Sequence, residues 1–313
     1  MILIDFNQQI ISSANYLHKN NIDINVNTLQ HTFFNYIISR LNGINKSQIA
    51  KKHGVFSKTA HDVIICCDGK NYWRRDYFQY YKIKRAESRS KSPLDWVKIF
   101  ECVDKIKANI TNNTKLKLIN VEKVEADDII SVLVKKFSGK GENICILSTD
   151  RDFIQLQVYD NVWQFSTMSN SFIKPEISGV DSLIDKLIVG DSGDGVPNIL
   201  SADDIFVQEK GRQTPIRKPR YEELYKAIKN KVLKCANYED MMIIEEHSSN
   251  LDRNNQLMNL ITGIPNHISN SIIEEYEKVA VSNDELDVFN CLNFIRNNNF
   301  NIEKCDLVYI IGS

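Results

Sequence analysis

Short, uninterrupted apolar runs constrain this chain more than any other feature. The runs at 2–4, 63–67 and 144–147 are separated by long stretches in which apolar residues keep helical spacing. Continuous apolar runs of this length are typical of parallel strands buried on both faces. Together with a further run at 115–121, they predict an α/β fold with a mostly parallel central sheet.

An acidic residue follows each predicted strand. Asp5 and Asp68 come directly after their strands, Asp150 follows the third after a Ser-Thr step, and the fourth leads into Glu125. Ligands of open α/β sheets bind beyond the carboxyl ends of the strands. Acids from four strands are therefore expected at one edge of the sheet.

Two of these acids belong to dense clusters, Glu125-Ala126-Asp127-Asp128 and Asp150-Arg151-Asp152. Carboxylates this close repel one another unless cations neutralise them, and Mg²⁺ or Mn²⁺ prefers such oxygen ligands. Taken alone, the first cluster fits the first turn of a helix at least as well, and the second could cap a short segment. The convergence from four strands favours a metal site.

The second half of the chain has a different pattern. A predicted helix at 183–189 runs into Gly190–Pro197, where Asp191 and Asp194 either form a polar turn or complete the acidic pocket. Only helices are predicted beyond it, at 221–233, 254–260, 265–280 and 284–296. We therefore expect an α/β domain at 1–180 and a helical subdomain at 181–313.

Basic and aromatic residues alternate between positions 71 and 92. Such a segment suits a nucleic-acid strand, because cations neutralise phosphates and rings stack on bases. The alternative is a solvated basic helix with a buried aromatic face. The segment lacks clear turn signals, so we expect it to be mobile without substrate, and Ser92-Pro93 should begin a helix reaching about residue 108.

Composition and cysteine usage argue against a disulfide-rich secreted protein and against a membrane protein. The chain has 313 residues, 42% of them hydrophobic, a net charge of −1 and seven cysteines without metal-ligand spacing, which we interpret as reduced core residues. We expect a monomer in the cytoplasm without a membrane partner, because no apolar run has membrane length and no basic leader precedes the first strand.

The motifs, taken in order, resemble the 5′ nuclease or flap endonuclease family, most closely its RNase H branch from T-even bacteriophages. The fold implied is a PIN-like nuclease domain. The resemblance spans nearly the whole chain and rests on Leu3-Ile4-Asp5, Cys67-Asp68-Gly69, Tyr72-Trp73-Arg74-Arg75-Asp76, Tyr80-Tyr81-Lys82 with Arg85, Glu125-Ala126-Asp127-Asp128, Ser148-Thr149-Asp150 with Asp152-Phe153, and Gly190-Asp191 with Asp194-Gly195.

The resemblance implies roles for these residues. Two Mg²⁺ ions, replaceable by Mn²⁺, would share nine acids: Asp5, Asp68, Asp127 and Asp150 around the first, Asp152, Asp191 and Asp194 around the second, and Glu125 and Asp128 directly or through water. Lys82 and Arg85 would reach the scissile phosphate. The segment 71–92 would form an arch that binds nucleic acid through Trp73, Arg74, Arg75, Tyr77, Tyr81 and Lys84, with Tyr81 stacked on the terminal base.

The sequence departs from the family after Val196. Family members carry a glycine-rich helix–hairpin–helix loop there, whereas this chain has Pro197–Asp204 without glycine and with Asp203 and Asp204. Close backbone approach to phosphate needs glycine, and Asp203 and Asp204 add unfavourable charge, so we expect a modified hairpin and leave open whether it binds a potassium ion. Duplex DNA would instead be contacted by the basic residues that follow, Lys210, Arg212, Arg217, Lys218 and Arg220, unless these form only an exposed basic loop.

The implied function is a 5′→3′ exonuclease and flap endonuclease that removes RNA primers and adjoining DNA from lagging-strand fragments during phage replication in the infected host. Its partners would be flapped or nicked duplexes and RNA–DNA hybrids, with a single-stranded-DNA-binding protein and a sliding clamp. The alternatives are a junction-binding protein without catalysis and a PIN-like RNase without a 5′-end requirement. The apolar tail at 307–311 would dock on the body or bind a replication protein.

Overall fold

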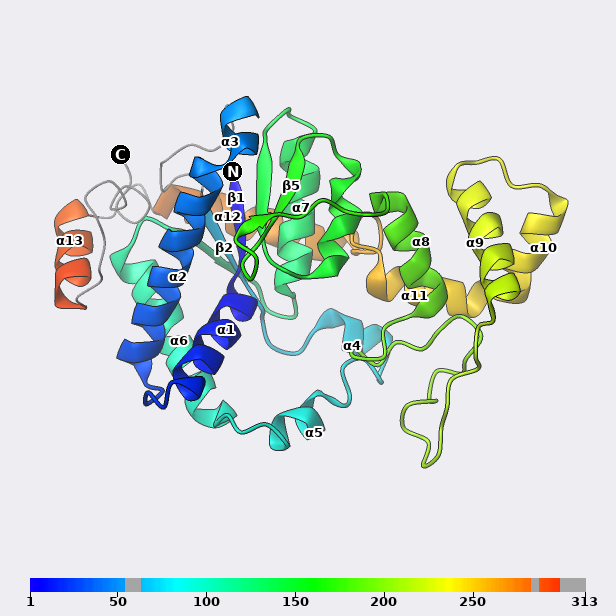
Figure 1. Ribbon diagram of the computed structural model, residues 1–313, viewed down its shortest axis with the longest axis horizontal. Coiled ribbons are helices and arrows are strands. Elements are labelled where there is room, and N and C mark those ends of the chain that lie inside the picture. The colour runs from blue at the N-terminus through cyan, green and yellow to red at the C-terminus, as the bar shows by residue number, and fades with distance from the viewer. Residues whose placement is uncertain (54–62, 283–286, 299–313) are drawn as a thin grey trace.

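A six-stranded sheet forms the centre of the molecule (Figure 1). The computed structural model describes residues 1–53, 63–282 and 287–298. The strands lie in the order β3-β2-β1-β4-β5-β6; the first five are parallel and β6 runs antiparallel to β5. This confirms the predicted mostly parallel sheet, whose strands are β1 (Ile2–Asp5), β2 (Val63–Cys67), β3 (Lys117–Asn120), β4 (Ile144–Leu147), β5 (Val162–Ser166) and β6 (Ser171–Phe172).

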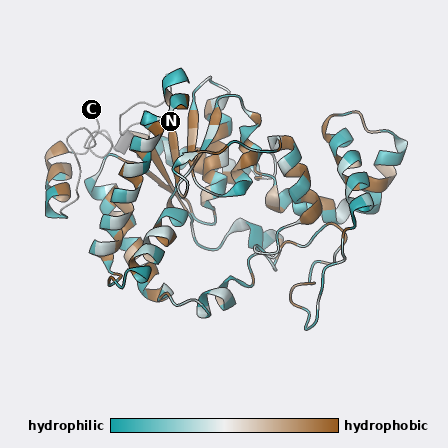
Figure 2. Cartoon of the chain, viewed as in Figure 1, coloured by the Kyte–Doolittle hydropathy of each residue, from teal (hydrophilic) through white to brown (hydrophobic). Residues whose placement is uncertain are grey.

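Helices cover both faces of the sheet. Along β1, Ile2 and Ile4 face one hydrophobic core and Leu3 faces the other, as the alternation of side chains along a strand requires. Figure 2 shows this apolar interior beneath polar outer faces. The first core packs against α1 (Phe6–Lys19), α2 (Val26–Lys46), α6 (Trp96–Asn113) and α13 (Val288–Asn297), the second against α7 (Ala126–Ser138), η2 (Arg151–Val158) and α12 (Asn266–Ser282).

Four helices build a separate core beside the sheet: α8 (Gly179–Val189), α9 (Lys218–Val232), α10 (Tyr238–Glu246) and α11 (Ser248–Met258). They form the right-hand part of the molecule in Figure 1. The chain then returns, and α12 packs against the sheet domain. The helical C-terminal region therefore contributes to the separate core and also to the two cores that flank the sheet. The domain boundary at residue 180 stays a prediction.

A strap crosses the carboxyl edge of the sheet between β2 and α6 (Figure 1). It contains α4 (Trp73–Tyr77) and α5 (Arg85–Ser90). Phe78 and Tyr81 of the strap pack with Val196 and Leu257. The strap is thus attached to the helical region at its base.

One local prediction was wrong, and α3 (Gln48–His53) follows α2 without having been predicted. Helix α6 begins after Asp95, whose carboxylate accepts from the Lys98 amide at 3.0 Å, so Ser92-Pro93 is not its cap. The tail at 307–311 and Cys305 lie outside the described residues.

Within the described parts of the chain, no helix combines the length and apolar character that crossing a bilayer requires. The six described cysteines are free thiols, and all except Cys235 are buried. Five of them therefore fit their interpretation as core residues.

Candidate metal centre

The acidic residues lie where the topology of the sheet changes direction. Strands β2 and β3 lie on one side of β1, and β4 and β5 lie on the other. Ligands of α/β sheets bind at such switch points. Asp5 ends β1 and caps α1, its Oδ1 accepting from the Gln8 amide at 3.1 Å. Asp150 follows β4 and accepts from the Asp152 amide at 2.9 Å.

Asp68, just beyond β2, is fixed by two hydrogen bonds from other elements. The amide of Ala126 at the start of α7 donates to its Oδ1 at 2.8 Å. The side chain of Asn7 in α1 donates to its Oδ2 at 2.6 Å. Asp68 therefore joins α1, β2 and α7 at the edge, and Asn7 is a site residue that no local sequence pattern indicated.

The first group of acids consists of Asp5, Asp68, Asp127 and Asp150, whose carboxylates repel one another. Burial, together with the charges of Asp68 and Asp150, raises the pKa of Asp5 to about 7. Burial also raises the pKa of Asp127, with added repulsion from Asp150 and Asp5. These carboxylates thus repel one another, with Asp5 buried and Asp150 exposed, and a divalent cation would relieve the repulsion.

The donor set fits a hard, hydrated ion. Among the described residues, no three or more His, Cys, Asp or Glu side chains form a ready-made ligand cluster. Mg²⁺ usually keeps several waters and binds through one or two carboxylates. An open rim of oxygen donors suits such an ion better than it would suit a tetrahedral zinc site.

In the second group of acids, Asp152, Asp191 and Asp194, a lysine pairs with two of the carboxylates. The Lys186 Nζ in α8 lies 2.7 Å from Asp152 Oδ1 and 2.8 Å from Asp191 Oδ2. Burial raises the pKa of Asp152 to about 6, although Lys186 acts in the opposite direction. For Asp191 the attraction of Lys186 outweighs burial, and its pKa is lowered. Lys186 was not among the predicted site residues, because its role depends on the packing of α8 beside η2.

The turn that carries Asp191 and Asp194 docks on the strap. The Lys82 amide donates to the Asp194 carbonyl at 2.7 Å. Gly195 has a φ of +74°, and a Cβ there would lie 2.6 Å from the carbonyl oxygen of Tyr80. Glycine therefore permits this close approach.

Glu125 lies in a buried cluster of cations and hydroxyl groups. Its carboxylate contacts Lys82, accepts from Arg74 at 2.8 Å and accepts from the Tyr81 hydroxyl at 3.0 Å. Burial alone would raise the pKa of Glu125, yet Lys82 and Arg74 lower it to about 2. Glu125 is thus ionised and already neutralised by the protein.

The structure corrects the roles of three predicted site residues. Asp128 is fully buried; it accepts from both terminal nitrogens of Arg74, at 2.9 and 2.7 Å, and from Trp73 Nε1 at 2.9 Å. Its oxygens are therefore engaged rather than open to a metal. Trp73 and Arg74 are themselves buried where they bond to Asp128. They therefore do not form a nucleic-acid surface.

The proposed phosphate-binding pair surrounds Asp194. Lys82 Nζ lies 3.5 Å from Asp194 Oδ2, and Arg85 Nη2 lies 3.0 Å from Oδ1. Lys82 is buried, whereas the Arg85 side chain is 36% exposed. Tyr81 is also buried, with its hydroxyl 3.3 Å from Asp194, so the predicted base-stacking ring is not open to solvent here.

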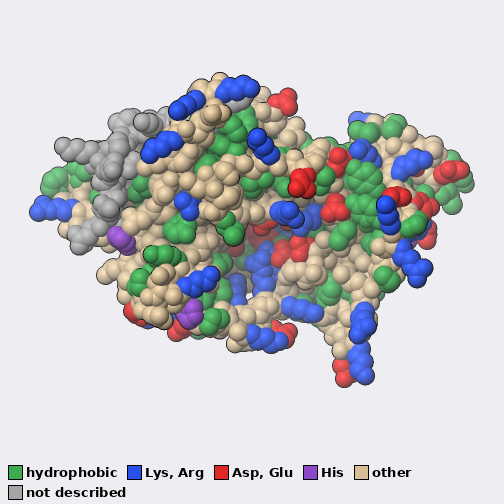
Figure 3. Space-filling model, in the orientation of Figure 1, with side chains coloured by type: hydrophobic (Ala, Val, Ile, Leu, Met, Phe, Trp, Pro, Cys, Tyr) green, Lys and Arg blue, Asp and Glu red, His purple; other side chains and the backbone are tan. Residues whose placement is uncertain are grey.

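The remaining predicted nucleic-acid contacts are exposed. Arg75, Tyr77 and Lys84 lie on the strap. In Figure 3, basic side chains surround a hollow with acidic side chains at its centre and continue onto the loop that projects between α8 and α9. Four of the expected basic residues in and after that loop are exposed: Lys210, Arg212, Arg217 and Lys218.

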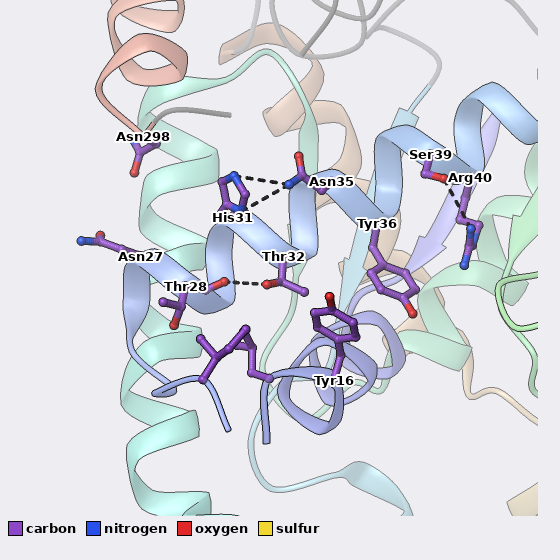
Figure 4. A pocket seen from close by; sticks show the side chains of 12 residues that line it. Tyr16, Asn27, Thr28, His31, Thr32, Asn35, Tyr36, Ser39, Arg40 and Asn298 are labelled. Carbon is purple, nitrogen blue, oxygen red and sulfur yellow. Dashed lines mark hydrogen bonds between the residues drawn. The ribbon is translucent and has the colours of Figure 1, made fainter. Parts of the chain in front are cut away.

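A larger cavity lies away from the acids, between α1 and α2 (Figure 4). Its volume is about 710 Å³, and its lining contains Tyr16, His31 and Arg40 but no acid. The cavity beside the acids measures only about 20 Å³. The larger cavity is therefore separate from the acidic site, beside which there is little enclosed space.

Comparison with known proteins agrees with this architecture. Residues 17–181 match the family described as 5′-3′ exonuclease, N-terminal resolvase-like domain. Ribonuclease H of Enterobacteria phage T4 is 31% identical over 278 residues, covering 88% of this chain and 85% of that protein. A 5′-3′ exonuclease of Buchnera aphidicola is 27% identical over 202 residues, covering 61% of this chain and 64% of that protein.

Solved structures share the fold. The bacteriophage T5 flap endonuclease, in a complex with DNA and metal ions, has a TM-score of 0.58 and 16% sequence identity, covering 90% of this chain and 98% of its own. The T5 5′-exonuclease with bound zinc has a TM-score of 0.56 and 17% identity, covering 90% of this chain and 99% of its own. The chain therefore belongs to the 5′-3′ exonuclease family of nucleases.

Proposed function

We propose that this protein is a Mg²⁺-dependent 5′→3′ exonuclease and flap endonuclease that removes RNA primers and adjoining DNA from lagging-strand fragments. The observation that carries the proposal is the meeting of acids from separate strand ends beside the basic pair Lys82 and Arg85. The names of its relatives, Ribonuclease H and 5′-3′ exonuclease, support the same activity.

Asp5, Asp68, Asp127 and Asp150 would hold one ion, and Asp152, Asp191 and Asp194 the other. When bound, Mg²⁺ or Mn²⁺ lowers the pKa of an attacking water and neutralises charge on the leaving oxygen of a phosphodiester. The protein holds the carboxylates at the edge through main-chain and side-chain donors. Glu125 would act through Lys82 and Tyr81, which it orients, rather than as a direct ligand.

Lys82 and Arg85 would stabilise the scissile phosphate electrostatically. Both cations already lie against Asp194, so an incoming phosphate exchanges one anionic partner for another. Phosphoryl transfer is catalysed mainly by such positioning and charge stabilisation.

The substrate would be a branched or nicked duplex, or an RNA–DNA hybrid. Arg75, Tyr77 and Lys84 on the strap would contact the 5′ strand, and the basic loop before α9 would contact the duplex. We further propose that the monomer acts in the cytoplasm of the infected host, where a single-stranded-DNA-binding protein and a sliding clamp recruit it.

Cleavage of a 5′-labelled flap and of an RNA-primed nicked duplex, with Mg²⁺ or with EDTA, tests the proposal. Short labelled products that require the metal would support it. Tight flap binding without cleavage would instead identify a junction-binding protein.

A blocked 5′ end distinguishes the remaining alternative. An enzyme that captures a free 5′ end should lose activity when a bulky group caps the flap. An RNase that cuts internally should cleave capped and free substrates equally.

A further inference from the structure

One buried arginine organises the loop that follows the acidic turn. Arg253 in α11 is 4% exposed. Its Nη2 donates to the main-chain carbonyls of Pro197 at 2.9 Å and Asn198 at 3.1 Å, and its Nη1 donates to the carbonyl of Ser201 at 3.3 Å. Three carbonyl oxygens of one short loop thus converge on a single cationic group.

Every nitrogen of the Arg253 head group has an acceptor. Nη1 also donates to Asp203 Oδ1 at 2.5 Å and to Asn250 Oδ1 at 3.1 Å, and Nε donates to Asn254 Oδ1 at 3.0 Å. A buried charge persists only when it is paired and hydrogen-bonded in this way. Converging carbonyls are also the ligands that replace water around K⁺, so the guanidinium occupies a position suited to a monovalent cation.

The same contacts extend to the basic segment. The Asn198 side chain donates to the Thr214 carbonyl at 2.8 Å, and the Thr214 amide donates to Ser201 Oγ at 2.9 Å. Gln213 Oε1 accepts from the Asn198 amide at 2.6 Å. The conformation around Arg253 therefore determines where the exposed cations of residues 210–218 lie.

Arg253 also offsets the negative charge of Asp203. From the sequence alone, this charge is unfavourable for phosphate binding. Its ion pair with Arg253 neutralises that charge next to the basic segment, so the loop presents less repulsion to a polyanion.

We propose that Arg253 is a positioning residue that serves as a built-in cation for the loop 197–203. The loop, and the duplex-binding segment attached to it, would then keep their conformation whichever monovalent cation is in solution. The duplex part of this inference rests on the proposed function; the cation part does not.

The wild-type protein provides the first test. Its thermal unfolding and its affinity for a plain DNA duplex in EDTA are compared in potassium, sodium and choline chloride at equal ionic strength. We expect equal unfolding temperatures and duplex affinities that agree within about twofold, because ionic strength alone sets the electrostatic term. A specific requirement for potassium would overturn the proposal.

The second test is Arg253→Ala, which empties the carbonyl cage. We expect a lower unfolding temperature that potassium or dilute guanidinium raises more than choline does, and a duplex affinity about tenfold weaker that the same cations restore. Arg253→Lys, which keeps the charge, should fall between the two proteins. The matched control is Arg40→Ala, since Arg40 donates to the main-chain carbonyl of Thr167 at 2.8 Å, belongs to none of the proposed nucleic-acid contacts and should give no cation-specific response.

The outcomes separate the two claims. An Arg253→Ala protein that unfolds at the wild-type temperature, or whose loss no cation relieves, would contradict the built-in cation. If Arg253→Ala does not fold, the wild-type comparison and the Arg253→Lys variant still test whether Arg253 acts as a built-in cation. A wild-type protein that is indifferent to the cation but binds no duplex would contradict the proposed function and leave the role of Arg253 intact.

Discussion

At the scale of single residues, the site consists of carboxylates in two electrostatic states. Asp5 and Asp127 have raised pKa values because burial and neighbouring acids disfavour their charge. Glu125 and Asp191 have lowered pKa values because lysine and arginine overcome burial. The first state attracts a metal ion; in the second the protein already offsets the charge, and at Asp191 a second ion would take the place of Lys186.

Replacing Asp150 by Asn should abolish cleavage and leave flap binding intact, because the substitution removes a negative ligand while keeping the side-chain shape. Single-turnover cleavage and a binding titration on the same labelled flap measure both properties. Asp104→Asn is the control, since Asp104 is 65% exposed and pairs with Lys70 at 3.9 Å. Simultaneous loss of cleavage and binding would show that Asp150 supports the fold instead.

Metal binding should strengthen as the pH rises through the window set by Asp5 and Asp152, whose pKa values are raised to about 7 and about 6. A raised carboxylate pKa means that the metal-free folded state binds more protons than the unfolded state between pH 4 and 7, so its free energy of unfolding should fall as the pH rises there. Thermal unfolding at pH 5.5 and pH 8, with EDTA or Mn²⁺, measures both effects. Equal stabilisation by Mn²⁺ at the two pH values would contradict this assignment.

Replacing Arg85 by Ala should slow single-turnover cleavage by about 10²- to 10³-fold, the loss expected when one group that stabilises developing charge is removed. Arg85 is suited to this test because it is partly exposed, so its removal should not unfold the protein. Arg89→Ala is the control on the same helix, since Arg89 lies over the rings of Trp96 and Phe100 at 5.4 and 5.0 Å and is not among the proposed substrate contacts. An unchanged rate in the Arg85 variant would remove it from the proposed phosphate site.

At the scale of elements, the strap is anchored by α4. Arg74 joins it to α7 through Asp128 and Glu125, and to the end of α11 through the Leu257 carbonyl at 2.8 Å. The strap base is therefore part of the core, while α5 has no buried residue. Substrate contact belongs to the exposed side chains beyond this anchor.

Arg74→Ala should lower the free energy of unfolding by about 3–5 kcal/mol, because it leaves the buried Asp128 carboxylate without its cation and removes one of the two cations at Glu125. Arg75→Ala is a matched control in the next position: Arg75 is exposed and donates one hydrogen bond, to the Tyr81 carbonyl at 3.3 Å, so its removal should cost within about 0.5 kcal/mol. Urea unfolding of both variants gives the comparison. Equal losses would mean that the buried pair does not anchor the strap.

The elements with strong periodicity were predictable, and the contacts between distant elements were not. The apolar runs that became β1, β2 and β4 indicated the sheet and the edge where its acids meet. Helix α10 was missed because its only buried apolar residue is Ile244, which gives no helical stripe. The burial of Arg74 with Asp128, 54 positions away, and the bridge from Lys186 to two acids depend on tertiary packing that no local pattern encodes.

At the scale of the whole molecule, the sheet domain and the helices beside it both contribute to one acidic edge. The sheet domain supplies most of the acids, and α8 and its following turn supply Lys186, Asp191 and Asp194. The strap packs against Val196 and Leu257 through Phe78 and Tyr81, and the Tyr81 hydroxyl donates to Glu125 before α7 at 3.0 Å. A long substrate placed across this edge would contact the strap, the acids and the basic loop together.

The most direct test of the central claim is single-turnover release of a 5′-labelled product from a flap substrate while Mg²⁺ is titrated into EDTA-treated protein. We predict no product without metal, a rise to saturation with Mg²⁺, and none at any Mg²⁺ concentration for Asp150→Asn. Cleavage that persists in EDTA, or an Asp150→Asn protein as active as the wild type, would contradict the account of the acidic edge as a metal-dependent nuclease centre.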